Sequence, residues 1–249
     1  MIQYLNMFAN LYQTILYIPL FNLLVFFYNI VPGHDLGLAI ILLTIATRII
    51  LSPFFVQSIK AQRSMQAIQP KLDALKEKYK DSKEKLGPAI MEFYKKEKVN
   101  PFSSCLPLLI QLPFLIAVYQ VFISGLTKNS FDKLYSFVAN PGPLNPLAFG
   151  FLDLSEKSVV IAVLAGLAQF WQSKSMMSKQ SSKLGQLTSG NPMANAMTKQ
   201  MTYFMPVITI FIGATLPAGL TFYWFLTTLF SALQQVLLFK KLDKIENSS

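Results

Sequence analysis

Charged side chains are scarce in this sequence of 249 residues: 14% of positions are charged, while 53% are hydrophobic. A soluble domain usually has about a quarter charged residues, so the composition argues against one ordinary soluble core. The few charges are mainly basic, with 22 Lys and Arg against 12 Asp and Glu and a net charge of +10. This combination predicts a membrane protein whose basic residues are confined to particular loops.

Cysteine and histidine each occur once, as Cys105 and His34. A lone cysteine excludes an internal disulfide framework, and these two residues are too few for a His/Cys zinc site. The sequence also has no GxxxxGK, GxGxxG or GxSxG motif, which removes the common phosphate-binding loops and the nucleophile elbow. Most enzyme classes are thereby excluded. We expect a protein that is not an enzyme and that has no metal or cofactor.

Asp and Glu are absent from five long apolar stretches, which we expect to be membrane-spanning helices. About 20 helical residues span a hydrocarbon core of about 30 Å. The expected spans are Leu36–Val56, Cys105–Leu126, Ser158–Gln172, Met201–Leu216 and Leu220–Phe239. The third and fourth are short and predict local thinning of the bilayer. The predicted fold class is all-α, a polytopic membrane protein with five transmembrane helices.

Basic residues lie in alternate loops between these stretches. Residues 57–104 contain 11 basic and 6 acidic residues, residues 173–200 contain 4 basic and no acidic residues, and the chain after Phe239 contains 3 basic and 2 acidic residues. The rest of the chain is neutral in sum. Because cytoplasmic loops accumulate Lys and Arg, this pattern predicts an outside N-terminus and a cytoplasmic C-terminus.

The N-terminal segment lacks the basic start of a signal peptide, because the first basic residue is Arg48, and we expect it to be kept. Its apolar part, Leu11–Val31, contains the amides Gln13, Asn22 and Asn29. This part could cross the membrane or lie in the membrane surface. Because a crossing would put an uncharged N-terminus in the cytoplasm, we expect an interfacial amphipathic helix within residues 1–34.

The first cytoplasmic loop, residues 57–99, is predicted to form a helical hairpin. Apolar residues recur every three or four positions in both halves, from Met65 to Tyr79 and from Leu86 to Phe93. Residues 173–200 have no such period and are rich in Ser and Met, so we expect a flexible cytoplasmic loop there. A short cytoplasmic tail at 240–249 completes the predicted organisation.

Arg48 is the most informative single residue, because it lies deep within the first apolar stretch. About 12 Å of helix separates it from the cytoplasmic end at Val56, which is too far for simple snorkelling. No carboxylate in the five stretches can pair with it. A guanidinium in hydrocarbon costs at least about 2.5–3.5 kcal/mol. We therefore expect Arg48 to face a water-filled cavity; the alternative is a structural role satisfied by backbone carbonyls or lipid phosphate.

Other polar side chains of the apolar stretches fit a hydrophilic inner surface. Gln111 lies in the second stretch, and Gln169 and Gln172 share one face of the third. Further amides and hydroxyls, among them Gln234, Gln235 and Thr227, lie in the fifth. Each alone is explained by an ordinary interhelical hydrogen bond, and Tyr223 and Trp224 by an interface belt. Together with an unpaired arginine they favour a hydrophilic groove.

Several motifs occur in an order and spacing that resemble the YidC family of membrane protein insertases, over about residues 6–243. They are Asp35–Ile41, Thr47-Arg48, Ser52-Pro53, Gln69-Pro70, Tyr94–Lys96, Val99–Pro101, Cys105–Gln111, Met205-Pro206, Leu216–Leu220 and Tyr223-Trp224. The resemblance is to the bacterial short form, without a large extracytoplasmic domain. It implies an insertase core at residues 35–245 in the bacterial cell membrane.

What the resemblance implies is a groove open to the cytoplasm and to lipid. The family's groove arginine matches Arg48, its groove glutamine matches Gln172 with Gln169 as an alternative, and its aromatic residue matches Trp224 beside Tyr223. The expected function is insertion and folding of nascent membrane proteins, alone or with the Sec translocon. Signal recognition particle, ribosome and anionic lipid are further expected partners. A small-solute transporter or channel and a lipid-binding scaffold are the competing interpretations.

Overall fold

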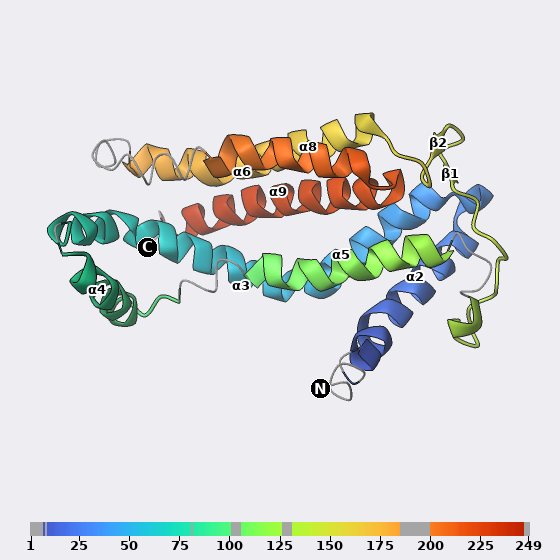
Figure 1. The fold of residues 1–249 in the computed structure, drawn as a ribbon, viewed down its shortest axis with the longest axis horizontal. Helices are drawn as coiled ribbons and strands as arrows, with labels where there is room; N and C mark the ends of the chain where they lie inside the picture. The colour runs from blue at the N-terminus through green and yellow to red at the C-terminus, as the bar shows by residue number, and fades with distance from the viewer. Residues whose placement is uncertain are drawn as a thin grey trace.

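The computed structural model describes residues 7, 9–80, 82–100, 106–125, 131–184 and 200–246, and most of them are helical (Figure 1). The α-helices are α2 (Ile18–Ile30), α3 (Leu36–Lys78), α4 (Lys83–Lys96), α5 (Leu106–Gly125), α6 (Val159–Leu184), α8 (Met205–Thr215) and α9 (Ala218–Glu246). Two π-helical segments, η1 (Gln13–Tyr17) and η5 (Gln200–Phe204), precede α2 and α8, and 3-10 turns lie at η2 (Pro32–His34) and η4 (Phe131–Lys133). Strands β1 (Leu147–Ala148) and β2 (Leu152–Asp153) pair antiparallel.

The start of α3 is fixed by Asp35. One oxygen of its carboxylate accepts a hydrogen bond from the backbone N–H of Leu38 at 2.9 Å, which caps the helix. The other oxygen accepts from the backbone N–H of Phe149, beside β1. A Cβ on Gly37 would lie 2.8 Å from the Cβ of Ala148, so a glycine is needed for this close approach. The same short segment therefore begins α3 and holds the β1–β2 hairpin against it.

Helix α3 is longer than the sequence predicted, because it has 43 residues and passes through both Val56 and the first half of the expected hairpin. Pro53 and Pro70 lie inside it without ending it. No glycine lies between Gly37 and Lys78, so the change from an apolar to an amphipathic pattern alters the surroundings of the helix and not its backbone. Beyond Lys78 the chain turns, and α4 runs back beside the end of α3 (Figure 1).

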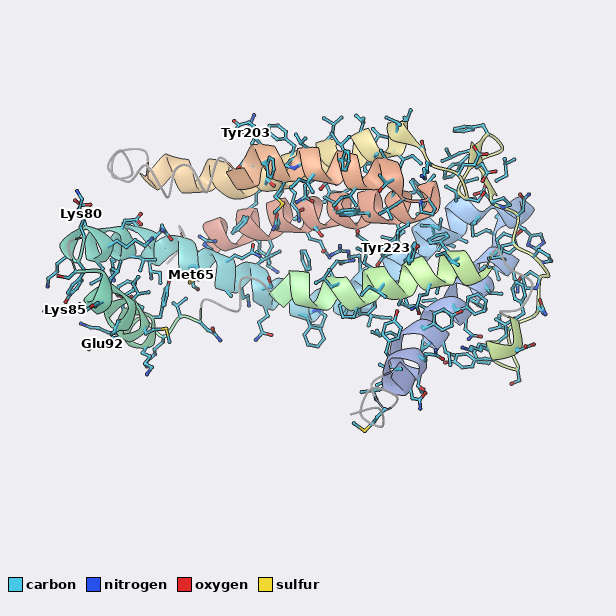
Figure 2. The ribbon with its side chains drawn as sticks, in the orientation of Figure 1. Met65, Lys80, Lys85, Glu92, Tyr203 and Tyr223 are labelled. Carbon is cyan, nitrogen blue, oxygen red and sulfur yellow. The ribbon has the colours of Figure 1, made fainter. Side chains whose placement is uncertain are left out.

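Helices α3 and α4 contact each other. Ile68 and Leu72 are buried, and Lys71 Nζ lies 2.9 Å from a carboxylate oxygen of Glu97. Lys80, Lys85 and Glu92 point away from the pair in Figure 2, and all three are exposed. Contact between the two helices through their predicted apolar faces stays a prediction.

Two further boundaries differ from the prediction. Helix α6 continues past Gln172 to Leu184, so the first part of the segment expected to be a flexible loop, residues 173–184, is helical. That part contains no Pro or Gly, and the first glycine is Gly185; polar composition alone does not end a helix. Residues 185–199 of the expected loop lie outside the described residues. Helix α9 likewise continues into the expected tail, as far as Glu246.

Helices α6, α8 and α9 pack side by side as one group (Figure 1). Small residues allow this packing: a Cβ on Gly166 would collide with the side chain of Ile210, and one on Gly213 would lie 3.2 Å from the Cβ of Ala162. The principal apolar core lies elsewhere, where α2, α3, α5 and α9 meet. Its fully buried members include Phe21, Leu24, Leu36, Ile40, Leu43, Val118 and Val121.

Three helical segments of the described chain are long and apolar enough to cross a membrane: Ala9–Ile30, Leu36–Met65 and Ala218–Lys241. Shorter apolar helices occupy Gln111–Ile123 and Thr202–Thr215, within the second and fourth expected spans. The N-terminal segment, expected to lie in the membrane surface, is therefore also capable of crossing by length and composition.

The amide side chains of that N-terminal segment bind the loop after α5. Asn22 is buried; its Nδ2 donates to the carbonyl of Lys133 at 3.0 Å, and its Oδ1 accepts from the N–H of Tyr135. Asn29 Nδ2 donates to the carbonyl of Ala139 at 2.7 Å. At the other end of the segment, Lys133 Nζ donates to Gln13 Oε1 at 3.0 Å. These amides therefore serve contacts with residues 133–139, which lie between α5 and α6.

Candidate functional site

Arg48 is buried between α3 and α9. Only 8% of the residue is exposed, and its Nη2 donates to the backbone carbonyl of Thr227 at 2.7 Å. Its guanidinium also lies 5.0 Å from the ring centroid of Phe55, two turns further along α3, which is within range for a cation–π contact. The side chain is thus held at a fixed place in the interface between the two longest helices.

A cavity of about 300 Å³ adjoins Arg48. Its described lining combines polar and apolar groups from α3 and α9: Ile45, Arg48, Ile49, Ser52, Phe230 and Gln234. Because liquid water takes about 30 Å³ per molecule, the space is large enough for roughly ten waters or a short piece of another chain. Ile49 is 69% exposed on the outer surface of α3, so the cavity adjoins the apolar surface of the molecule.

The expectation that Arg48 faces a cavity and the alternative of a backbone carbonyl partner both describe part of what the structure contains. The Thr227 carbonyl takes one N–H of the guanidinium, which has several donors and no acceptor. No described carboxylate lines the cavity. On α3 itself the nearest ones in sequence are Asp35, about 20 Å away along the helix, and Asp73, which is further. The site is therefore positive and rich in hydrogen-bond donors.

Tyr223 extends this polar region toward α5. It is 2% exposed, and its hydroxyl lies close to the side chains of Thr47 and Gln111 and to Arg48. Figure 2 shows Tyr223 on the side of α9 that faces α5. Three of the residues predicted from the sequence, Arg48, Gln111 and Tyr223, are thus brought together from three different helices.

The other three predicted residues are not joined to this group by any described contact. Gln169 and Gln172 lie on α6 and are half-buried, as is Trp224 on α9. None of them belongs to the described lining of the cavity. The backbone carbonyl of Trp224 accepts from the Thr227 hydroxyl at 2.9 Å, within α9. Their role at the site stays a prediction.

From the sequence, Thr227 and Gln234 of α9 were expected only to fit a hydrophilic inner surface, and neither was predicted to lie beside Arg48. The Thr227 carbonyl accepts from Arg48 and also from the Ser231 hydroxyl at 2.8 Å, and Gln234 lines the cavity. These residues follow one another at i, i+4 and i+7, which places them on one face of a helix. That spacing is the signal which, combined with Arg48, could have found them.

The family model described as "60Kd inner membrane protein" matches residues 26–245, which include the whole of this site. The chain belongs to this family. Three relatives, each named "Membrane protein insertase YidC", support the same assignment. The one from Fusobacterium nucleatum is 33% identical over 83% of this chain and 87% of its own length. Those from Aeromonas salmonicida and Francisella tularensis subsp. novicida are 34% and 36% identical over 91% and 80% of this chain.

These relatives differ in how much of their own length the chain covers. The matched region is 36% of the Aeromonas protein and 31% of the Francisella protein, so the chain spans about a third of each of these YidC insertases. The resemblance inferred from the motifs is confirmed: this is a YidC family protein and, with its apolar helices, a multi-pass membrane protein.

Proposed function

We propose that this protein is a membrane protein insertase and chaperone that works without enzymatic chemistry. The observation that carries the proposal is Arg48, buried beside a cavity between α3 and α9 with no described carboxylate in the lining. Relatives similar over most of this chain are named membrane protein insertases. Nascent membrane proteins are therefore the proposed substrates.

The proposed mechanism follows from the cost of moving polar groups through hydrocarbon. An unpaired peptide group costs several kcal/mol there. A cavity that contains a guanidinium and water offers hydrogen bonds part of the way across, so it lowers this cost for a short polar or acidic segment. The adjoining exposed apolar surface, which includes Ile49 and Ile50, lets the hydrophobic segment of the substrate pass into lipid.

The proposed orientation places the α3–α4 hairpin in the cytoplasm and residues 131–158 outside. The hairpin carries half of the basic residues, in keeping with the positive-inside rule. The N-terminal segment contacts the loop after α5 from Gln13 to Asn29, about 24 Å of helix. A helix held along its length by one loop fits the membrane surface better than a crossing. The basic hairpin is the proposed contact for ribosome, signal recognition particle and anionic lipid, with the Sec translocon as an optional partner.

The proposal is tested by reconstitution in liposomes with a single-span substrate that has an acidic outer tail. We expect Arg48→Ala to reduce protease-protected insertion about tenfold, because at least one charge-assisted hydrogen bond is lost. Arg48→Lys keeps the charge without the planar fork and should be intermediate. Lys240→Ala, an exposed basic residue outside the hairpin, is the matched control. Unimpaired insertion by Arg48→Ala across several substrates would contradict the mechanism.

The same liposomes separate the competing functions. A transporter or channel would release a trapped small solute without any protein substrate, and a lipid scaffold would bind anionic vesicles without inserting a protein. Insertion without solute release supports the proposed function.

A further inference from the structure

We propose that the cavity beside Arg48 recognises the peptide backbone of an entering polar segment, with Gln234 as the hydrogen-bond acceptor opposite Arg48. The inference rests on the proposed insertase function and names what the site would bind. It makes Gln234 a residue that determines which polar segments are accepted.

The lining of the cavity offers donors and acceptors from opposite helices. Arg48 of α3 can only donate. Gln234 of α9 lies two turns after Thr227, whose carbonyl holds Arg48. Its side-chain amide has both an oxygen acceptor and an N–H donor. Of the lining side chains, only the Ser52 hydroxyl also has an acceptor.

The Gln234 amide is not held through its oxygen. Gln234 Oε1 is buried and has no hydrogen-bond donor among the described residues. A half-turn about the last side-chain torsion exchanges the amide oxygen and nitrogen while the shape of the side chain is unchanged. Because no described residue donates to the oxygen, turning it toward an occupant of the cavity would break no hydrogen bond of that oxygen, and the new hydrogen bond would satisfy an acceptor that now lacks one.

A peptide unit complements the donor Arg48 and the acceptor Gln234, because it has one group of each kind. Each residue except proline has one N–H and one C=O, and both must be satisfied away from water. An occupant whose C=O accepts from Arg48 and whose N–H donates to Gln234 Oε1 has both groups paired. A carboxylate has no N–H, so it would pair with Arg48 and leave the oxygen of Gln234 without a donor. The cavity therefore fits an extended polar segment of any side-chain composition, provided that its backbone has N–H groups.

The test compares substrates that differ in backbone N–H groups. Three single-span proteins have the same hydrophobic helix and an uncharged Ser/Gly tail, a Pro-containing tail of the same length in which every residue is Pro, or an acidic tail. Proline removes the N–H and keeps the C=O. Each substrate is offered to the full-length protein in liposomes, and capture by a photoreactive amino acid at position 49 is measured in parallel with insertion.

Gln234→Leu is expected to lower capture and insertion of the Ser/Gly tail about fivefold, the size of one lost hydrogen bond, with little change for the Pro-containing tail. Gln234→Glu keeps an oxygen acceptor and adds a negative charge. It should therefore retain the Ser/Gly tail and capture the acidic tail less well, a pattern that general damage to the fold would not produce. Gln120→Leu, the same change at an exposed site of α5, should change none of these values.

Equal losses with the Ser/Gly and Pro-containing tails, or unchanged capture by Gln234→Leu, would overturn the assignment to Gln234. Either result leaves the insertase function standing if insertion still depends on Arg48. Conversely, capture of the Ser/Gly tail that depends on Gln234, without insertion by any variant or by the parent protein, would overturn the proposed function and support the binding site.

Discussion

The two halves of the membrane part of α3 differ in how completely their polar groups are paired. At the start of the helix both carboxylate oxygens of Asp35 accept backbone hydrogen bonds, and the nearby amide of Asn22 uses its oxygen and its nitrogen. Four turns further on, Arg48 has a described bond to one carbonyl, a cavity adjoins it, and Gln234 Oε1 has no described donor.

This difference suggests a division of tasks along one helix. At the loop end, meaning the start of α3 and the loop between α5 and α6 that contacts it, the polar groups are hydrogen-bonded to that one loop. Such pairing fixes a single structure. The polar groups near Arg48 keep hydrogen-bonding capacity that an outside chain could use. Changes at the loop end should therefore act on stability, and changes around Arg48 should act on substrates.

The largest expected effect on stability is that of Asn22→Leu. The substitution removes the hydrogen bonds to the Lys133 carbonyl and the Tyr135 N–H, so both backbone groups lose their side-chain partner. We expect a loss of about 3 kcal/mol, since an unsatisfied buried group costs about 1–3 kcal/mol. The loss of stability should appear as a lower apparent melting temperature in detergent and as faster protease cleavage of residues 131–145. Asn140→Leu, at an exposed position of the same loop, is the control; equal effects of the two changes would contradict the proposed role of Asn22.

The second prediction compares one substitution at two glycines. Gly37→Ala places a Cβ 2.8 Å from the Cβ of Ala148, whereas Gly87 on α4 has open space around its Cβ position apart from its neighbours in the chain. Overpacking should destabilise Gly37→Ala by about 1–3 kcal/mol. Gly87→Ala should change stability by less than about 0.5 kcal/mol, because the helix preference of alanine is opposed by the clash of its Cβ with the ring of the following Pro88. Thermal unfolding of both variants measures the difference. Equal shifts would show that the start of α3 is not tightly packed on the hairpin.

A smaller effect is expected for Tyr223→Phe, which lies at the boundary between the two regions. The change removes the hydroxyl that lies close to Thr47 and Gln111 and keeps the ring, so about 1 kcal/mol should be lost. Insertion of an acidic tail should fall by less than with Arg48→Ala. Tyr119→Phe, an exposed tyrosine on α5, serves as control. A loss of insertion as large as that of Arg48→Ala would mean that Tyr223 belongs to the substrate site itself.

The sequence predicted the helices better than their ends. The apolar stretches and the amphipathic halves of residues 57–99 are visible as patterns, because burial follows periodicity. The continuity of α3 beyond Val56 and of α6 beyond Gln172 was not predicted, because a change from apolar to polar surroundings does not require a break in the backbone. For the site, Arg48 was recognised by its cost in hydrocarbon. The carbonyl of Thr227 could not be, since every residue has one and only the packing of α9 against α3 selects it.

The smallest effect concerns the pH dependence of the loop end. The Ser155 hydroxyl and backbone N–H both donate to Asp153 at β2, which lowers the pKa of that carboxyl. A group whose native pKa lies below its unfolded value stabilises the fold above the unfolded pKa, and this contribution is lost as the pH falls through the native pKa. Because Asp153 lies at the partly exposed edge of a short hairpin, the loss below about pH 4 should be slight and local. Hydrogen exchange of residues 152–156 between pH 6 and pH 3 measures it, and Asp153→Asn should remove the dependence while insertion stays unchanged. An equal pH dependence in Asp153→Asn would assign the titration to another group of the loop end.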